Sequence, residues 1–274
     1  TAFTLTITQT DTVGFSGGSL NMDVPGLGGI KINRGSGGTG IDIIDDKMPT
    51  AWEETNGTSL GTGLQTVAGS GGYVNVGWSL SSDMLPDGLS VDLAWAPRAG
   101  SNATADKGLG GDSPGMGQSY DIVLQHSGLI DGLNVFAGHA TIEQIAATSS
   151  TTGDRSQYAF GATYAFGGVT IGYQQSEDNT NSAVASATSY YDNEAYAISF
   201  NVNDNLALSY GVHDSKRAMT SGVDTELSAE SLQLSYTMGG ATFIVAESSV
   251  DNGNYSSGTA SDRDGTTLKL SLAF

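Results

Sequence analysis

The last nine residues of the chain, Thr266 to Phe274, read TTLKLSLAF. Side chains alternate between the two faces of an extended strand. Every second residue from Leu268 onward is therefore apolar and shares one face, while Lys269 and small polar residues share the other. A strand of this kind suits a membrane barrel, in which the apolar face meets lipid and an aromatic residue such as Phe274 lies at the interface. One strand does not separate a barrel from a soluble fold, so the choice rests on repetition.

The same alternation recurs along the chain and predicts fourteen strands. They span residues 3–8, 19–24, 29–33, 73–80, 89–95, 120–125, 133–140, 158–166, 169–175, 194–202, 206–212, 230–238, 241–247 and 266–274. Short joins such as PGLGG, GLIDG and NDN alternate with long joins rich in Ser, Thr, Asn, Asp and Gly. This order predicts antiparallel hairpins with tight turns at one end of the sheet and long loops at the other.

Composition and charge exclude several classes of protein. The 274 residues include no Cys and carry 29 acidic against ten basic side chains, a formal net charge of −19. Binding to nucleic acid requires an excess of Lys and Arg, so nucleic acid is not an expected partner. No run of about 18 apolar residues predicts a transmembrane helix, whereas the strands of a barrel need only alternate. The chain starts in a strand pattern without a secretory signal, so we expect a mature or trimmed form.

The polar faces of the predicted strands favour a membrane barrel over a soluble sandwich. In a soluble sandwich the polar faces carry Lys and Glu to water. Here they carry mainly Thr, Ser, Asn, Gln and Gly, while the charges concentrate in the loops and aromatic residues cluster near strand ends. A ring of about fourteen strands also encloses an interior too wide for side chains to fill. The sequence therefore predicts an all-β, transmembrane antiparallel up-and-down β-barrel, with residues 1–274 as a single domain.

The segment 34–71 interrupts the strand pattern and contains the candidate site residues. Structureless loops of almost forty residues are uncommon in compact folds unless they are functional. Folded inward, this segment would narrow the lumen and place negative charge at the constriction, where it attracts cations and repels anions. Its acidic residues are Asp42, Asp45, Asp46, Glu53 and Glu54. A solvated surface loop is the alternative, and charge alone favours that alternative.

Strand alternation also assigns charged strand residues to faces. The residues that share a face with the polar side chains, and are therefore predicted to point into the lumen, are Lys31, Lys269, Asp23, Asp92 and Asp121. Only two lysines within the predicted strands could therefore oppose the acidic loop.

Three features together resemble the general porins of Gram-negative outer membranes, especially the alphaproteobacterial branch. They are the strand pair SLNMDV-PGLGG-IKINRG leading into the acidic loop, the alternating strand that follows it, and the final LKLSLAF. The resemblance implies a location in the outer membrane, a homotrimer, and contact with outer-membrane lipid and lipopolysaccharide. It also implies passive diffusion of small hydrophilic solutes and ions, no catalysis and no required cofactor.

The resemblance further implies sixteen strands and an inward loop after the fifth strand. Here the corresponding loop follows the third strand, so we expect that a first hairpin is absent from this sequence; a genuine fourteen-stranded barrel is the alternative. Porins of this type pair acidic residues of the inward loop with basic residues on the facing wall. The residues carried over to the pore constriction are Asp42, Asp45, Asp46, Glu53, Glu54, Lys31 and Lys269.

The segment GGTGIDIID, residues 37–45, matches one copy of a calcium-binding nonapeptide. Sites of that kind need neighbouring turns to supply further oxygens, and the motif occurs once. A calcium ion held loosely by Asp42, Asp45 and Asp46 is the more plausible form of binding, because hard cations take several oxygen ligands. The alternative function from another class is accordingly a secreted, acidic, calcium-binding β-rich adhesin or surface-layer protein.

Overall fold

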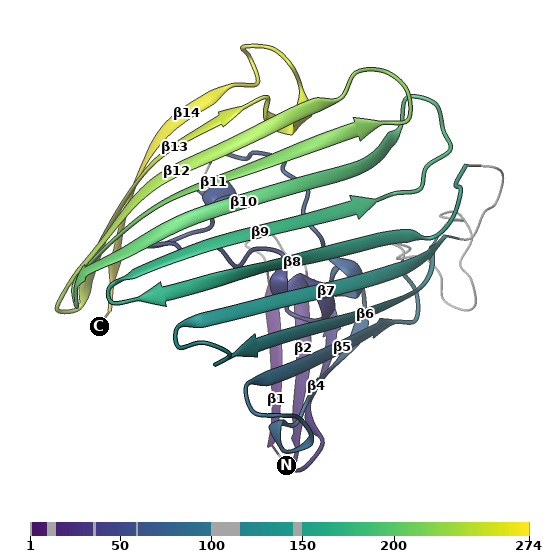
Figure 1. Ribbon diagram of the computed structural model, residues 1–274, viewed down its shortest axis with the longest axis horizontal. Helices are drawn as coiled ribbons and strands as arrows, with labels where there is room; N and C mark the ends of the chain where they lie inside the picture. The colour runs from purple at the N-terminus through teal and green to yellow at the C-terminus, as the bar shows by residue number, and fades with distance from the viewer. Residues whose placement is uncertain are drawn as a thin grey trace.

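A computed structural model of the protein describes residues 2–9, 15–34, 37–58, 60–99, 116–144 and 150–273. They form one antiparallel sheet of fourteen strands in which each strand pairs with its neighbours in the sequence (Figure 1). This confirms the predicted all-β, up-and-down fold. No helix in the described part of the chain is both long and apolar enough to cross a membrane. Phe274, predicted to lie at the interface, falls outside the described residues.

The strands differ in length around the sheet. They are β1 (Ala2–Gln9), β2 (Phe15–Val24), β3 (Gly28–Arg34), β4 (Asn75–Leu80), β5 (Leu89–Ala96), β6 (Met116–Ser127), β7 (Leu133–Gln144), β8 (Arg155–Phe166), β9 (Val169–Asn179), β10 (Thr188–Asn203), β11 (Leu206–Met219), β12 (Thr225–Met238), β13 (Ala241–Asp251) and β14 (Arg263–Leu272). Short 3-10 helices lie between them: η1 (Gly40–Ile44), η2 (Thr55–Gly57), η3 (Gly69–Gly72), η4 (Ser82–Met84) and η5 (Gly253–Tyr255). The wall is therefore taller along β6 to β13 than along β3 to β5.

The sheet curves around an interior space, called the lumen below. In Figure 1 the long strands β6 to β13 form one wall, and β1 and β2 lie behind them. Within the described residues β1 pairs with β2 alone and β14 with β13 alone, and the figure draws these two outer strands apart. The number of strands in a complete barrel stays a prediction.

The outward face carries a band of exposed apolar side chains. Leu5 is 69% exposed and Leu268 is 75% exposed, although both are large aliphatic residues. The band is continuous across strands because the register aligns it: Ile198 of β10 lies opposite Ile171 of β9 and Tyr210 of β11. An exposed apolar surface of this extent is typical of a wall that meets lipid.

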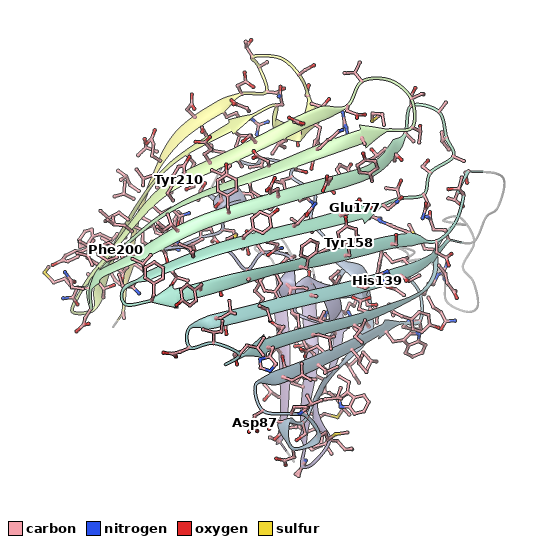
Figure 2. The ribbon with its side chains drawn as sticks, in the orientation of Figure 1. Asp87, His139, Tyr158, Glu177, Phe200 and Tyr210 are labelled. Atoms are coloured by element: carbon pink, nitrogen blue, oxygen red, sulfur yellow. The ribbon has the colours of Figure 1, made fainter. Side chains whose placement is uncertain are left out.

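The band has boundaries that Figure 2 makes visible. Phe200 lies near the end of the wall with the short turns, whereas Tyr158 lies closer to the end with the long loops. Above Tyr158 the outward positions become acidic, and the Tyr158 hydroxyl donates a hydrogen bond to Glu177 at 3.2 Å. The aromatic residues therefore lie where the outward face changes from apolar to charged, as interfacial girdles do.

Several strands extend further toward the long loops than the sequence pattern predicts. β10 begins at Thr188 instead of 194, and β11 continues to Met219 instead of 212. These extensions contain Asp192, Lys216 and other charged residues, so the prediction that charges concentrate in the loops is wrong for this part of the wall. Backbone pairing continues there, whereas the apolar alternation used to predict strands ends with the lipid-facing band.

The outward band generates a prediction for stability in a bilayer. Replacing Ile198, near the middle of the band, by Arg should lower the free energy of unfolding by about 2–4 kcal/mol, because a cation then faces hydrocarbon. The matched control is Thr163→Arg, since Thr163 lies on the inner face and borders a pocket of about 560 Å³. That change should alter the free energy by less than about 1 kcal/mol. Urea unfolding of the protein in phospholipid vesicles measures both, and equal losses would contradict the assignment of faces.

Candidate pore and its inner loop

The described part of segment 34–71, called the inner loop below, lies along the inner face of the wall. Backbone N–H groups of the loop donate to polar side chains that successive strands point inward. These bonds join Lys47 to Gln174 of β9 (3.0 Å), Ala51 to Ser209 of β11 (2.9 Å), and Trp52 and Glu53 to Gln233 of β12 (3.1 and 3.0 Å). The loop therefore follows the wall from strand to strand inside the lumen.

One buried carboxylate holds both ends of the inner loop. Asp121 of β6 accepts hydrogen bonds from the N–H of Ile41 (3.0 Å) and from the N–H and hydroxyl of Ser70 (2.9 and 2.7 Å). A Cβ atom built on Gly40 or Gly69 would lie 2.1 or 2.2 Å from Asp121 Oδ2, and both glycines have positive φ. Only glycine permits this approach of the loop backbone to the wall.

Three buried glutamines of the inner wall bind the loop backbone as well. Gln157 Oε1 accepts from the N–H groups of Ala68 and Gly69 (3.0 and 2.7 Å). Gln174 and Gln233 accept from the loop through Oε1 and donate to loop carbonyls through Nε2. A primary amide offers both a donor and an acceptor, so it satisfies an extended backbone on both sides.

The helix η1 has one face toward the wall and one away from it. Ile41 and Ile44, three residues apart, are fully buried against Val123 and Phe136 of the wall. Residues at this spacing share a face of a 3-10 helix. Asp42 lies between them in sequence and is only half-buried. Apolar burial of the two isoleucines against the wall therefore leaves Asp42 on the other side of η1.

The five acidic residues of the inner loop form one electrostatic cluster, called the loop carboxylates below: Asp42, Asp45, Asp46, Glu53 and Glu54. Burial, together with the charges of Asp42, Glu54 and Asp46, raises the pKa of Asp45 to about 7. Burial and then Glu54 raise the pKa of Asp46 to about 6. The pKa values of Asp42 and Glu54 are raised as well, in both cases mainly by burial, so these four carboxyls lose negative charge at a higher pH than isolated carboxylates do.

The two predicted lysines lie beside different parts of the inner loop, Lys31 at its start and Lys269 at its middle. Lys31 Nζ donates to the carbonyl of Gly37 at 2.7 Å, where the loop leaves β3. Its charge opposes the effect of burial, which raises the pKa of Asp42. Lys269 Nζ lies 5.4 Å from the ring centroid of Trp52, a cation–π distance. Both lysines therefore contact the loop that carries the carboxylates.

Three further cations on the inner wall were missed because the predicted strands stopped short of them. Arg155 pairs with Asp178 across β8 and β9, with Nε donating to Oδ1 at 2.7 Å. Arg217 and Arg263 donate to backbone carbonyls of Tyr255 and Leu60, at 2.8 and 2.7 Å. All three guanidinium groups are engaged by protein atoms beside the inner loop. Only the longer observed strands bring them onto the inner face.

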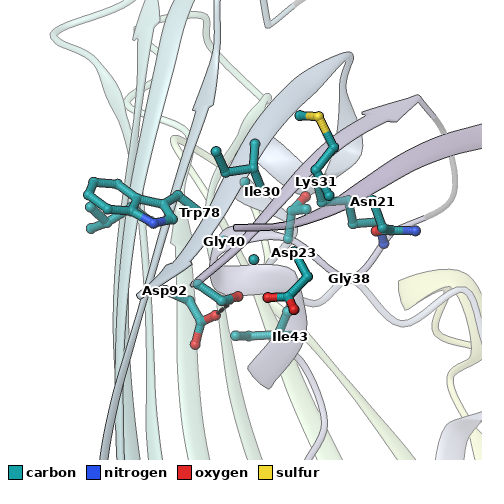
Figure 3. A pocket seen from close by; sticks show the side chains of 15 residues that line it. Asn21, Asp23, Ile30, Lys31, Gly38, Gly40, Ile43, Trp78 and Asp92 are labelled. Carbon is teal, nitrogen blue, oxygen red and sulfur yellow. Dashed lines mark hydrogen bonds between the residues drawn. The ribbon is translucent and has the colours of Figure 1, made fainter. Parts of the chain in front are cut away.

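The inner wall next to the start of the loop is also acidic. A pocket of about 250 Å³ opens there between β2 to β5 and η1, and its lining includes Asp23, Lys31 and Asp92 (Figure 3). The hydroxyl of Ser79 donates to Asp92. The predicted inward residues Asp23 and Asp92 thus border the lumen beside the loop.

The arrangement of the carboxylates bears on metal binding. No group of three or more His, Cys, Asp or Glu within the described ranges is arranged to hold a metal ion. Among the residues proposed as calcium ligands, the charges of Asp42 and Asp46 both raise the pKa of Asp45. Calcium binding stays a prediction.

Comparison with known proteins gives relatives by structure alone. No protein-family model matches the chain, and no curated protein sequence matches it. OmpF of Salmonella typhi, solved in a complex with daunomycin, is similar with a TM-score of 0.66 and 12% identity, over 95% of this chain and 79% of that one. An anion-selective porin from Comamonas acidovorans gives 0.61 and 12%, over 95% and 79%.

A third similar structure is the trimer form of OmpT, an outer-membrane protein of Vibrio cholerae. Its TM-score is 0.54 and its identity 15%, over 98% of this chain and 91% of that one. At such identities the likeness is one of fold. The fold of this chain is that of the outer-membrane porin barrels.

The double contact made by Asp121 generates a prediction for the inner loop. Asp121→Asn replaces one acceptor oxygen by a donor that faces N–H groups. Since hydrogen bonds to a charged group contribute about 1.5–3 kcal/mol each, exchange of the Ile41 and Ser70 amides should accelerate at least about tenfold. Hydrogen exchange of the folded protein in detergent measures this. The control is Asp92→Asn, which removes an inward carboxylate that bonds Ser79; equal exchange in the two variants would exclude the role of Asp121.

Proposed function

We propose that the protein is a porin of the Gram-negative outer membrane, which forms a water-filled channel for passive diffusion of small hydrophilic solutes and ions. The observation that carries the proposal is the inner loop: a segment of the chain that lies inside a wall with an apolar outward face. A lumen narrowed by a polar loop suits passage of solutes. We assign no catalysis to it.

The proposed channel favours cations. Five loop carboxylates, with Asp23 and Asp92 beside them, outnumber the lysines Lys31, Lys47 and Lys269. The inner-wall arginines are engaged by an aspartate or by backbone carbonyls. Fixed negative charge in a confined, poorly screened space raises the local concentration of cations. A structure of the same fold is named as anion-selective. Ion preference therefore has to come from the side chains at the constriction.

The proposal includes an assembly and surroundings. A homotrimer is supported by the trimer form of one protein of similar fold. The exposed apolar band suits contact with outer-membrane lipid, and the charged positions above it would face lipopolysaccharide. We retain membership in the alphaproteobacterial branch, a sixteen-stranded complete barrel and weak calcium binding as parts of the proposal. A secreted adhesin is disfavoured, because large apolar side chains would then face water.

Neutralising the loop carboxylates tests the proposed selectivity. The triple variant Asp42→Asn, Asp45→Asn, Asp46→Asn should lower the cation-to-anion permeability ratio at least about twofold, because it removes fixed charge from the constriction. The ratio follows from the reversal potential in planar bilayers under a salt gradient. The matched control neutralises Asp87, Asp131 and Asp204, which are exposed in short turns. This control removes the same formal charge as the loop variant. An unchanged reversal potential in the loop variant would remove the carboxylates from the mechanism.

The raised pKa values predict how the same ratio depends on pH. The carboxyls of Asp45 and Asp46 titrate near pH 7 and pH 6, so they are charged at pH 8 and mostly neutral at pH 5. The wild-type ratio should therefore fall between pH 8 and pH 5, a range in which ordinary carboxylates stay ionised. The triple variant should show a flatter profile. A wild-type ratio that stays constant down to about pH 5 would contradict the assignment.

A further inference from the structure

The long connection between β13 and β14 turns into the barrel. Its short helix η5 carries Tyr255, which is 4% exposed and clusters with Leu227 and Val250 of the inner wall. Leu60 and Leu64 of the inner loop pack against the same cluster. Residues 60–65, called the far limb below, therefore rest on a side chain supplied by an outer connection of the barrel.

Hydrogen bonds join this connection to the far limb. The N–H of Gln65 donates to Tyr255 Oη at 2.9 Å, and the same oxygen lies 2.7 Å from the hydroxyl of Ser215 on β11. Tyr255 thus links the far limb directly to the wall.

The backbone of the turn makes a second link to the far limb, because the N–H of Asn254 donates to the carbonyl of Thr62 at 2.7 Å.

Two arginines of the wall also bind this region, one to the far limb and one to the turn. Arg263 Nη1 donates to the carbonyls of Leu60 and Gly61, each at 2.7 Å. Arg217 donates to the carbonyl of Tyr255 at 2.8 Å, and its guanidinium carbon lies 5.3 Å from the centroid of the Tyr255 ring. The turn and the far limb are thus held together by both backbone and side-chain bonds.

The backbone of the turn is strained. Asn252, Asn254 and Tyr255 have φ values of 54°, 56° and 54°, in the left-handed region. Asparagine adopts this region fairly often, whereas a bulky aromatic residue rarely does. Residues persist in such conformations where surrounding contacts over-determine them. Here the strained turn directs the Tyr255 side chain inward, onto the far limb.

We propose that Tyr255 is a positioning residue of the channel, which holds the far limb against the wall and so sets the bore beside the loop carboxylates. The inference rests on the proposed function. The remainder of the loop has separate attachments, at Asp121, Gln174 and Gln233. Loss of the Tyr255 hydroxyl therefore loosens the far limb at Gln65, where that hydroxyl accepts its bond, and leaves the loop carboxylates in place.

The test is Tyr255→Phe, which removes Oη and keeps the ring. In detergent-folded protein, exchange of the Gln65 amide should rise about fivefold or more, because one hydrogen bond is lost, while exchange of the Ile41 amide stays unchanged. In planar bilayers the variant should show additional conductance levels with an unchanged reversal potential. The matched control is Tyr191→Phe: the Tyr191 ring lies 5.1 Å from that of Tyr255, but its hydroxyl bonds no far-limb atom in the described residues. It should behave as wild type.

Three outcomes would overturn the inference. They are unchanged exchange at Gln65, an equal rise at Gln65 and Ile41, which would indicate general loosening, and faster exchange at Gln65 with an unaltered current trace. A wild-type protein that conducts no ions would instead refute the proposed function. The exchange measurement would then still decide whether Tyr255 holds the far limb.

Discussion

Backbone hydrogen bonding is the constraint on which the structure depends. Hydrocarbon offers no partner to an N–H or a carbonyl, so a strand that crosses it must pair with strands on both sides. Pairing in sequence order from β1 to β14 meets this need along the described sheet. The alternation of side chains then divides the wall into an apolar outward face and an inner face of mostly small or polar residues.

The same requirement explains how the inner loop is held. Its backbone lies against the wall, away from regular structure, and would lack partners if the inner face were purely apolar. Asp121, Gln157, Gln174 and Gln233 supply those partners from four different strands. Apolar contacts of η1 with the wall fix its orientation and leave Asp42 on the opposite side of the helix. One face of η1 therefore attaches the inner loop to the wall, and the other face carries negative charge.

Much of the wall could be predicted from alternation, because the boundary between lipid and lumen imposes a period of two on every strand. The segment 133–140 is one example, since β7 begins at the same Leu133. Strand ends could not be predicted in this way, as β10 shows: above the lipid its outward side chains are no longer apolar, although pairing continues. Arg155, Arg217 and Arg263 were missed for that reason.

The candidate site, too, could be predicted only in part from the sequence. The acidic residues of the loop were visible because they are close together in the sequence. Their attachments were not, because Ile41 and Asp121 are 80 residues apart and Trp52 and Gln233 are 181 apart. Such pairs are set by the curvature of the whole sheet, and no local pattern encodes them.

These separations have a consequence for folding. The inner loop is made early in the chain, between β3 and β4, but its partners lie on strands as late as β12 and β14. Contacts over such sequence distances form slowly, because much of the chain must first be ordered. Docking of the loop is therefore a closing step of assembly, and a nascent wall that lacks its last strands contains a loop without its final attachments.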